Sequence, residues 1–319
     1  MALSQKDLVG LRGVPASEIS EILNTADLMK VILASNNKKT PHLQGKTVLT
    51  VFYENSTRTR LSFELASKCM GAVAANMSAS SSSVAKGESL IDTARTLDRM
   101  ASDVLILRHP MTGAPHLMAK HVKASVINAG DGTNEHPTQA LLDMFTMKEK
   151  LGGISGLNVA IVGDVTHSRV ARSNLWGLTT MGAKVTFAGP PTLLPVELAS
   201  AGCRVTECVD DAVREADVVM GLRIQLERQQ KGLFPSVREY HKYFGLTPER
   251  VALAKKGALV MHPGPMNRGV EIASSVADSE QSFIDEQVTN GVAIRMALLF
   301  LLTRSTGAAL PVGQDKGTR

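Results

Sequence analysis

The sequence contains few cysteines, and their spacing excludes two common uses of that residue. The chain has 319 residues and three cysteines, Cys69, Cys203 and Cys208. Their number is odd and no two of them form a Cys-x-x-Cys pair, so neither a disulfide framework nor a zinc site is indicated. We expect three mostly buried free thiols in a reducing compartment, and no metal centre.

The sequence also lacks a hydrophobic run long enough to cross a membrane. The most apolar stretch is residues 296–302, far shorter than the ~20 residues that a bilayer requires. Residues 1–13 carry charges where a signal peptide needs an apolar stretch. We therefore expect a soluble, cytoplasmic protein with no membrane partner.

Positive charge is in slight excess but is not concentrated in any segment. The formal net charge is +5, charged residues make up 20% of the chain, and there is no long run of lysine and arginine. A nucleic-acid-binding surface and a site for small anionic substrates are both compatible with an excess of cations. Because the excess is small and spread out, the sequence favours small anions and predicts no nucleic-acid partner.

Short apolar runs alternate with helical patterns along most of the chain, of which 44% is hydrophobic. The runs are nearly continuous in Val, Ile, Leu and Ala, as strands buried on both faces should be. They are residues 47–52, 103–108, 124–130, 157–164, 184–190, 217–223 and 258–264. This alternation predicts an α/β fold built from mostly parallel sheets flanked by helices.

A glycine-rich break at residues 151–156 divides the chain, whose length suggests about two domains. We predict a first domain at residues 1–150 and a second at residues 151–284. The helical pattern before the break, residues 138–150, would link the two domains. The last helix, residues 285–303, is apolar on several faces and is predicted to pack back across the junction.

Basic side chains recur where the predicted strands end. In open α/β sheets, ligands bind beyond the carboxyl ends of the strands, so polar residues at these ends are candidates for a site. Six basic residues follow or end a strand: Arg58, Arg60, Arg108, His136, Arg169 and Arg223. Together they predict one shared site for anions.

The most informative segment is residues 56–60, Ser-Thr-Arg-Thr-Arg, placed directly before a predicted helix. The free N–H groups and positive dipole at a helix N-terminus attract anions, and hydroxyl and guanidinium groups add donors. An ordinary N-cap explains one hydroxyl, but not three hydroxyls and two arginines. There is no Walker lysine, and no Gly-x-Gly-x-x-Gly follows the 157–164 strand, so a nucleotide site is not indicated.

The segment 56–60, followed by Ser-Phe-Glu, resembles the carbamoyl-phosphate signature of the carbamoyltransferases. Further motifs cover nearly the whole chain and are similar to the aspartate branch of the aspartate/ornithine carbamoyltransferase family. They are residues 86–93, 108–110, 128–143, 162–169, 223–225 and 262–272. Ornithine enzymes typically carry a His-Cys-Leu-Pro motif where this chain has His262-Pro263-Gly264-Pro265. Some aspartate enzymes have leucine at the position of Gly264.

The resemblance implies a set of residues that bind carbamoyl phosphate. The phosphate would be held by Ser56, Thr57, Arg58 and Thr59, with Arg108 reaching both phosphate and carbonyl oxygen. The catalytic residues that polarise the carbonyl would be Thr59, Arg108 and His136. The carbamoyl amide would be held by Gln139 and the backbone carbonyls of Pro263 and Gly264.

The resemblance also implies the site for the second substrate and an oligomer. The carboxylates of aspartate would be bound by Lys86, Arg169, Arg223 and Gln225. Ser82 and Lys86 would come from the neighbouring subunit of a homotrimer, on a lid that includes the serine-rich residues 78–83. A larger assembly with a regulatory chain or a dihydroorotase is left open.

The implied reaction transfers the carbamoyl group of carbamoyl phosphate to the amine of L-aspartate, as in pyrimidine biosynthesis. Fixed donors would stabilise the oxyanion of the tetrahedral intermediate, so no cofactor or metal is expected. Two alternatives stay open: a different acceptor amine such as ornithine, and a non-catalytic protein that binds anions or nucleic acid. His109 and His262, each before a proline, are interpreted as structural. Residues 226–244 are interpreted as a surface loop that closes on substrate, with a plain exposed loop as the alternative.

Overall fold

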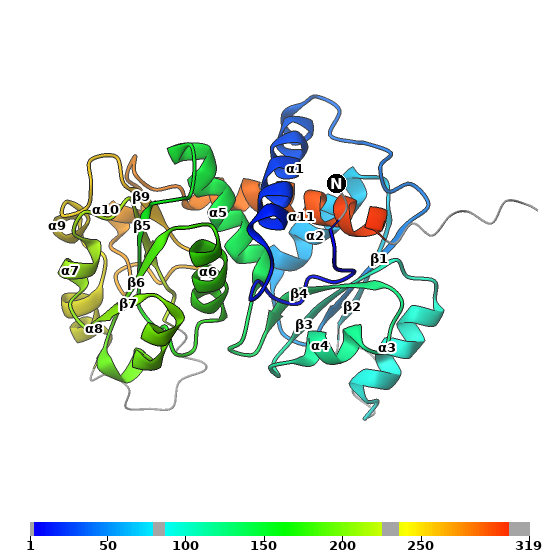
Figure 1. The fold of residues 1–319 in the computed structure, drawn as a ribbon, viewed down its shortest axis with the longest axis horizontal. Helices are drawn as coiled ribbons and strands as arrows, with labels where there is room; N and C mark the ends of the chain where they lie inside the picture. Colours follow the sequence, from blue (N-terminus) through cyan, green and yellow to red (C-terminus); the bar gives the residue numbers. More distant parts are fainter. Residues whose placement is uncertain (1–2, 79–86, 225–235, 306–319) are drawn as a thin grey trace, which may run out of the picture.

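The computed structural model describes residues 3–78, 87–224 and 236–305, and it contains two parallel sheets (Figure 1). The first sheet has four strands in the order β2-β1-β3-β4. They are β1 (Thr47–Phe52), β2 (Val73–Ser78), β3 (Val104–His109) and β4 (Ser125–Asp131). Every neighbouring pair is parallel, with Val48 of β1 opposite Val104 of β3.

The second sheet has five strands in the order β7-β6-β5-β8-β9, again all parallel. They are β5 (Asn158–Val162), β6 (Lys184–Ala188), β7 (Arg204–Thr206), β8 (Val218–Gly221) and β9 (Leu259–Met261). The α/β prediction with parallel sheets is confirmed. The sequence missed β2 and β7, because both are edge strands: β2 has no buried residue and β7 has three residues.

Helices flank both sheets. Around the first sheet lie α2 (Thr57–Cys69), α3 (Leu90–Arg99) and α4 (Ala114–Ala119). Around the second lie α6 (Arg169–Thr180), α7 (Val209–Val213), α8 (Val237–Phe244), α9 (Pro248–Val251), α10 (Ser274–Ala277) and the short 3-10 helices η3 (Pro191–Leu193) and η4 (Val196–Ala201). The loop predicted for residues 226–244 is wrong over α8, which buries Tyr240; residues 225–235 lie outside the described part of the chain.

Two helices join the sheets, as predicted. Helix α5 (Pro137–Leu151) follows the turn after β4 and ends at Gly152, which adopts the left-handed conformation that favours glycine. Helix α11 (Ile284–Ser305) follows β9 and packs against α1 (Ala16–Ala34), α2 and α5. In Figure 1 both helices run between the two sheets, with α1 beside them.

One large apolar core runs through this junction. It includes residues of α1, α5 and α11 as well as residues of both sheets. Within it α5 and α6 lie so close that a Cβ on Gly177 of α6 would stand 2.6 Å from the terminal methyl of Met144. Because a shared core links the two halves, the carboxyl ends of both sets of strands are held around one space.

The described residues contain no helix that is long and apolar enough to span a membrane. Of the cysteines, Cys203 is buried, Cys69 is half-buried and Cys208 is exposed, and all three are free. The expectation of free thiols is therefore confirmed, although the burial of Cys208 is not.

We expect Leu298→Ala in α11 to lower the free energy of unfolding by ~2–5 kcal/mol, because Leu298 is fully buried and the substitution leaves a cavity in the shared core. Urea denaturation checks this result. The control is Val31→Ala on α1, where the side chain is 71% exposed and a change within ~0.5 kcal/mol is expected. Equal effects of the two substitutions would contradict the assignment of α11 to the core.

Candidate functional site

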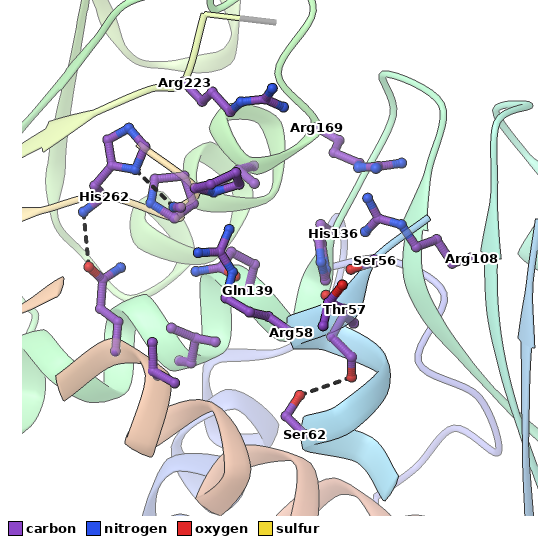
Figure 2. A pocket seen from close by; sticks show the side chains of 18 of the residues that line it. Ser56, Thr57, Arg58, Ser62, Arg108, His136, Gln139, Arg169, Arg223 and His262 are labelled. Atoms are coloured by element: carbon purple, nitrogen blue, oxygen red, sulfur yellow. Dashed lines mark hydrogen bonds between the residues drawn. The ribbon is translucent and has the colours of Figure 1, made fainter. Parts of the chain in front are cut away.

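A cavity of about 720 Å³ opens at the junction of the two sheets (Figure 2). Its lining comes from the ends of β1, β3, β8 and β9 and from α2, α5, α6 and α11. Eleven residues predicted for the site line it: Ser56, Thr57, Arg58, Thr59, Arg108, His136, Gln139, Arg169, Arg223, Pro263 and Gly264. Ser82, Lys86 and Gln225, also predicted, lie outside the described residues.

Five of the six basic residues found at strand ends meet in this cavity, as expected for a shared anion site. The sixth, Arg60, is exposed and lines a smaller neighbouring cavity beside Ser78. Along α2 the side chains of Arg58 and Arg60 are two residues apart, so they point to different sides of the helix. The sequence predicted both arginines near the site, but on the helix only Arg58 faces the large cavity.

The N-terminus of α2 opens into the cavity. Ser56 is its N-cap, yet its hydroxyl accepts no capping hydrogen bond, and the first turn contains no acidic residue. The first N–H groups of a helix have no partner within the helix, and they carry partial positive charge. The cap hydroxyl, Thr57 and these N–H groups therefore form a site suited to a phosphate.

Arg58 extends from α2 to the loop that follows β9 in the second sheet. A Cβ on Gly264, which has φ +61°, would stand 2.6 Å from Nη1 of Arg58, so in this arrangement the glycine lets the guanidinium approach the backbone of the loop. Burial, and next the charge of Arg223, lower the pKa of Arg58. Its guanidinium nevertheless stays charged, because arginine loses its proton only far above neutral pH.

Glu54, which the sequence analysis missed, joins two arginines from different parts of the fold. Its Oε2 lies 2.7 Å from Nη2 of Arg169 at the start of α6 and 3.3 Å from Nε of Arg108 in β3. Gly130, with φ +114°, leaves room for both guanidinium groups, since a Cβ there would stand 2.9 Å from Nε of Arg169. Figure 2 shows Arg108 and Arg169 pointing toward each other.

The signal that would have found Glu54 was its position. It comes two residues after β1, at the same strand end as the arginines, but an acid at a strand end does not by itself indicate an anion site. An acid among cations reduces their mutual repulsion and can exchange partners when an anionic ligand arrives.

His136 is 5% exposed and stands at the N-cap of α5. Its backbone N–H donates to Ser173 Oγ at 2.9 Å, and that hydroxyl donates to Glu135 at 2.8 Å. Burial, followed by the charges of Arg108, Arg169 and Arg295, holds the pKa of His136 well below its usual value. The imidazole is therefore neutral near pH 7, with one donor and one acceptor nitrogen.

The loop after β9 is held by its own histidine. His262 accepts a hydrogen bond from the N–H of Gly264 at 2.8 Å through Nδ1, and its Nε2 lies 3.2 Å from Glu271. The peptide bond between Gly264 and Pro265 is cis. His109 makes a similar bond, accepting from the N–H of Met111 at 3.0 Å. These contacts agree with the interpretation of both histidines as structural.

A buried polar cluster lies beneath the cavity, and the sequence did not reveal it. Asp143 on α5 is fully buried and accepts hydrogen bonds from Gln139, Gln287 and Asn174. Burial raises the pKa of Asp143 to about 6, although the three donors and Arg295 act in the opposite direction. Arg295, on α11, lines the cavity and stacks over Phe63 at 5.0 Å.

The chemistry available is that of cations and hydrogen-bond donors aimed at anions. Within the described ranges, no group of three or more His, Cys, Asp or Glu side chains is placed to hold a metal ion. The donors come from both sheets, so the cavity can hold an anion on each side and bring two anions together. Such a site suits the transfer of a group between two negatively charged molecules.

Two family models cover most of the chain. Residues 6–149 match the carbamoyl-P binding domain of aspartate/ornithine carbamoyltransferases, and residues 155–302 match their Asp/Orn binding domain. The aspartate carbamoyltransferase catalytic subunit of Ruminiclostridium cellulolyticum is 69% identical over 304 residues, covering 95% of this chain and 97% of the relative. That of Acetivibrio thermocellus is 67% identical with the same coverage.

Solved structures agree with these matches. Aspartate transcarbamoylase from Trypanosoma cruzi, in complex with N-(phosphonacetyl)-L-aspartic acid, has a TM-score of 0.84 and 31% identity, covering 93% of this chain and 96% of its own. Ornithine carbamoyltransferase from Pyrococcus furiosus has a TM-score of 0.84 and 32% identity, with coverages of 94% and 98%.

We expect the His136 imidazole to titrate well below the usual value for histidine and to be neutral near pH 7. NMR of protein labelled at histidine Cε1 checks this, with His136→Asn to assign the resonance and urea-unfolded protein, titrating near ~6.5, as reference. Because the folded pKa is depressed, the neutral ring contributes stability that is complete above about pH 6.5 and is lost as the pH falls toward the folded pKa. A midpoint near 6.5 in folded protein would contradict this electrostatic description.

Proposed function

The chain belongs to the aspartate/ornithine carbamoyltransferase family, and we propose that it transfers the carbamoyl group of carbamoyl phosphate to the amine of L-aspartate. The products are N-carbamoyl-L-aspartate and phosphate, a step of pyrimidine biosynthesis. The observation that carries the proposal is the convergence of arginines from both halves of the molecule on one cavity. Both substrates are anions, so this convergence matches their charge.

We assign carbamoyl phosphate to the side of the cavity formed by the first domain, residues 1–150. Its phosphate fits the N-terminus of α2, where the hydroxyls of Ser56, Thr57 and Thr59 and the guanidinium of Arg58 supply donors. Arg108 reaches the same space from the end of β3. Pro263 and Gly264, from the second domain, line the same cavity. Their backbone carbonyls would lie near the carbamoyl amide, next to Gln139.

The carbonyl oxygen of the carbamoyl group would lie near Thr59, Arg108 and His136. Attack by the amine makes a tetrahedral intermediate and turns this oxygen into an oxyanion. A neutral His136 can donate one N–H to that oxygen, and Arg108 adds positive charge. The C–O bond to phosphate then breaks, and the departing phosphate can take the proton that the amine releases.

We assign aspartate to the second domain, residues 151–284, where Arg169 and Arg223 face the cavity. Two guanidinium groups suit the two carboxylates of aspartate. An ornithine side chain carries a positive charge, and these arginines would repel it. The solved Trypanosoma cruzi enzyme was obtained with carbamoyl phosphate and aspartate bound, and it shares the fold of this chain with a TM-score of 0.82.

We further propose a homotrimer in which Ser82 and Lys86 complete the site of the neighbouring subunit, with Gln225 adding to the aspartate site. The support is the resemblance of their motifs to the family, since these residues lie outside the described ranges. A cytoplasmic location, and any larger assembly with a regulatory chain or a dihydroorotase, stay predictions.

The function is tested with purified protein and carbamoyl phosphate, comparing aspartate with ornithine as acceptor. We expect N-carbamoyl-L-aspartate as the product, and Arg223→Ala is expected to raise the KM for aspartate at least tenfold while carbamoyl phosphate still binds. The reason is that a hydrogen bond to a charged group contributes ~1.5–3 kcal/mol.

The control for this variant is Arg204→Ala, at an exposed position of β7 in the same domain, and it should leave the KM unchanged. Calorimetry that shows loss of carbamoyl phosphate binding in Arg223→Ala would move Arg223 to the phosphate side. Turnover of ornithine in preference to aspartate would refute the assigned acceptor.

The shared site is tested by mixing two inactive variants, Lys86→Ala and Arg58→Ala, under conditions in which subunits exchange. A mixed trimer contains one interface at which one chain supplies an intact Arg58 and its neighbour an intact Lys86. Activity should therefore return to about a third of normal per mixed trimer, given closed ring symmetry. Hybrid trimers verified by mass spectrometry but without activity would show that each chain builds its own site.

A further inference from the structure

We propose that Asp143, which does not line the cavity, is a positioning residue that orients the side-chain amide of Gln139. In this orientation the carbonyl oxygen of Gln139 faces the cavity and accepts a hydrogen bond from the NH₂ group of the carbamoyl donor. Asp143 thereby sets the preference for a carbamoyl group over an acyl group of the same shape. The inference rests on the proposed function and adds a source of its substrate selectivity.

The orientation of the neighbouring amides fixes both oxygens of Asp143 as acceptors. Gln287 accepts a hydrogen bond from the backbone N–H of His262 at 2.9 Å, so its NH₂ end is the one that lies 2.7 Å from Asp143 Oδ1. Asn174 donates to the backbone carbonyl of Val170 at 3.1 Å, so its NH₂ end is the one 2.8 Å from Asp143 Oδ2. A peptide N–H can only donate and a carbonyl oxygen can only accept, which removes the usual ambiguity of amide orientation.

Gln139 is the third partner, with its amide 2.9 Å from Asp143 Oδ1. A carboxylate can only accept, so Gln139 must present its NH₂ group to Asp143. Its carbonyl oxygen is then the end of the amide left to face the cavity that Gln139 lines. The opposite orientation would set an oxygen against an oxygen inside the protein, where an unmade hydrogen bond is costly.

Burial raises the pKa of Asp143 to about 6, so the carboxylate is mainly ionised at neutral pH even though its burial opposes the charge. Three donors converge on it, and the fully buried Arg295 adds a favourable positive charge. Asp143 is 0% exposed, so its charge acts within a medium that screens it little. At neutral pH the acceptor at Gln139 is therefore defined before any ligand arrives.

A fixed acceptor at this place distinguishes two ligands of the same shape. A carbamoyl group presents NH₂ where an acetyl group presents CH₃, and only the NH₂ can satisfy the oxygen of Gln139. A site built to hydrogen-bond an N–H rejects the analogue that lacks it, because its own polar group is left unpaired. If Gln139 were free to turn, its NH₂ could face either ligand and this discrimination would weaken.

The test uses two stable phosphonates that differ only in this group: phosphonoacetamide, which has NH₂, and 2-oxopropylphosphonate, which has CH₃. Calorimetry gives the Kd of each for the intact oligomer. In the wild type we expect phosphonoacetamide to bind about tenfold more tightly, a difference of ~1.4 kcal/mol that lies within the range of one hydrogen bond. In Asp143→Asn, which keeps the shape but adds a donor, we expect the ratio of the two Kd values to fall by about tenfold, with 2-oxopropylphosphonate bound as before.

A double-mutant cycle shows whether Asp143 acts through Gln139. In a Gln139→Met background, Asp143→Asn should no longer change the ratio, because the acceptor it orients is absent. Thr146→Val is the matched control: Thr146 is equally buried, one turn further along α5, and accepts a hydrogen bond from Asn290 of α11 at 3.0 Å. That variant should lower the Tm and leave the ratio unchanged.

Three results would overturn the inference. They are an unchanged ratio in folded Asp143→Asn, an equal loss of affinity for both phosphonates, and an effect that persists without Gln139. If Asp143→Asn does not fold, a neutron structure of the wild type decides, since deuterium on the cavity side of Gln139 would contradict the orientation. Failure of the proposed function is distinguishable: without a carbamoyl phosphate site the wild type would bind neither phosphonate, and an acceptor other than aspartate would appear in the activity assay while the ratio of the two Kd values stayed as expected.

Discussion

The carboxylate of Glu54 lies between the guanidinium groups of Arg108 and Arg169, and much of the site depends on this contact. Arg108 ends a strand of the first sheet, whereas Arg169 begins a helix of the second half, so one carboxylate connects the two halves at the cavity. Without an acid between them, the two cations would repel each other in a partly buried space. The contact also leaves positive charge unneutralised nearby, which is what anionic substrates require.

A second carboxylate, that of Asp143, is buried among the helices at the junction. Asp143 is buried where α5, α6 and α11 meet, and it satisfies side chains from all three helices. Burial raises the pKa of Asp143 to about 6, and three donors with a nearby guanidinium offset part of the cost of burying its charge. The polar cluster therefore carries a net cost of burial at neutral pH, and it fixes the direction of the Gln139 amide that faces the cavity.

Glu54 and Asp143 serve different electrostatic needs of the reaction: Glu54 holds two arginines together, and Asp143 orients the amide of Gln139. Two anionic substrates must approach each other, and an additional negative charge develops as the tetrahedral intermediate forms. Arginines supply the countercharge, and His136, kept neutral by burial and by its cationic neighbours, supplies a hydrogen-bond donor without carrying a charge of its own. Because these groups are held by the shared core, little reorganisation is needed when the substrates bind.

Sequence alone determined the α/β class, seven of the nine strands in the described residues and the joining helices, and eleven of the site residues that it predicted line the cavity. It could do so because buried strands and helices have distinct periods of hydrophobicity, and because ligands gather at the carboxyl ends of parallel strands. The edge strands β2 and β7 were missed because exposed or very short strands bury too little to leave a pattern. Helix α8 was taken for a loop, since its polar composition hides one buried tyrosine, Tyr240.

Only the tertiary structure decided which charges meet. Glu54 and Arg169 are 115 residues apart, and Asp143 and Gln287 are 144 apart, so no local pattern could pair them. The same holds for Arg60, which adjoins the phosphate motif in sequence but turns away on the helix. The depressed pKa of His136 likewise depends on burial and on three arginines brought together from β3, α6 and α11. Hydrophobic periodicity is a property of neighbours in the chain, whereas electrostatic pairing and desolvation are properties of neighbours in space.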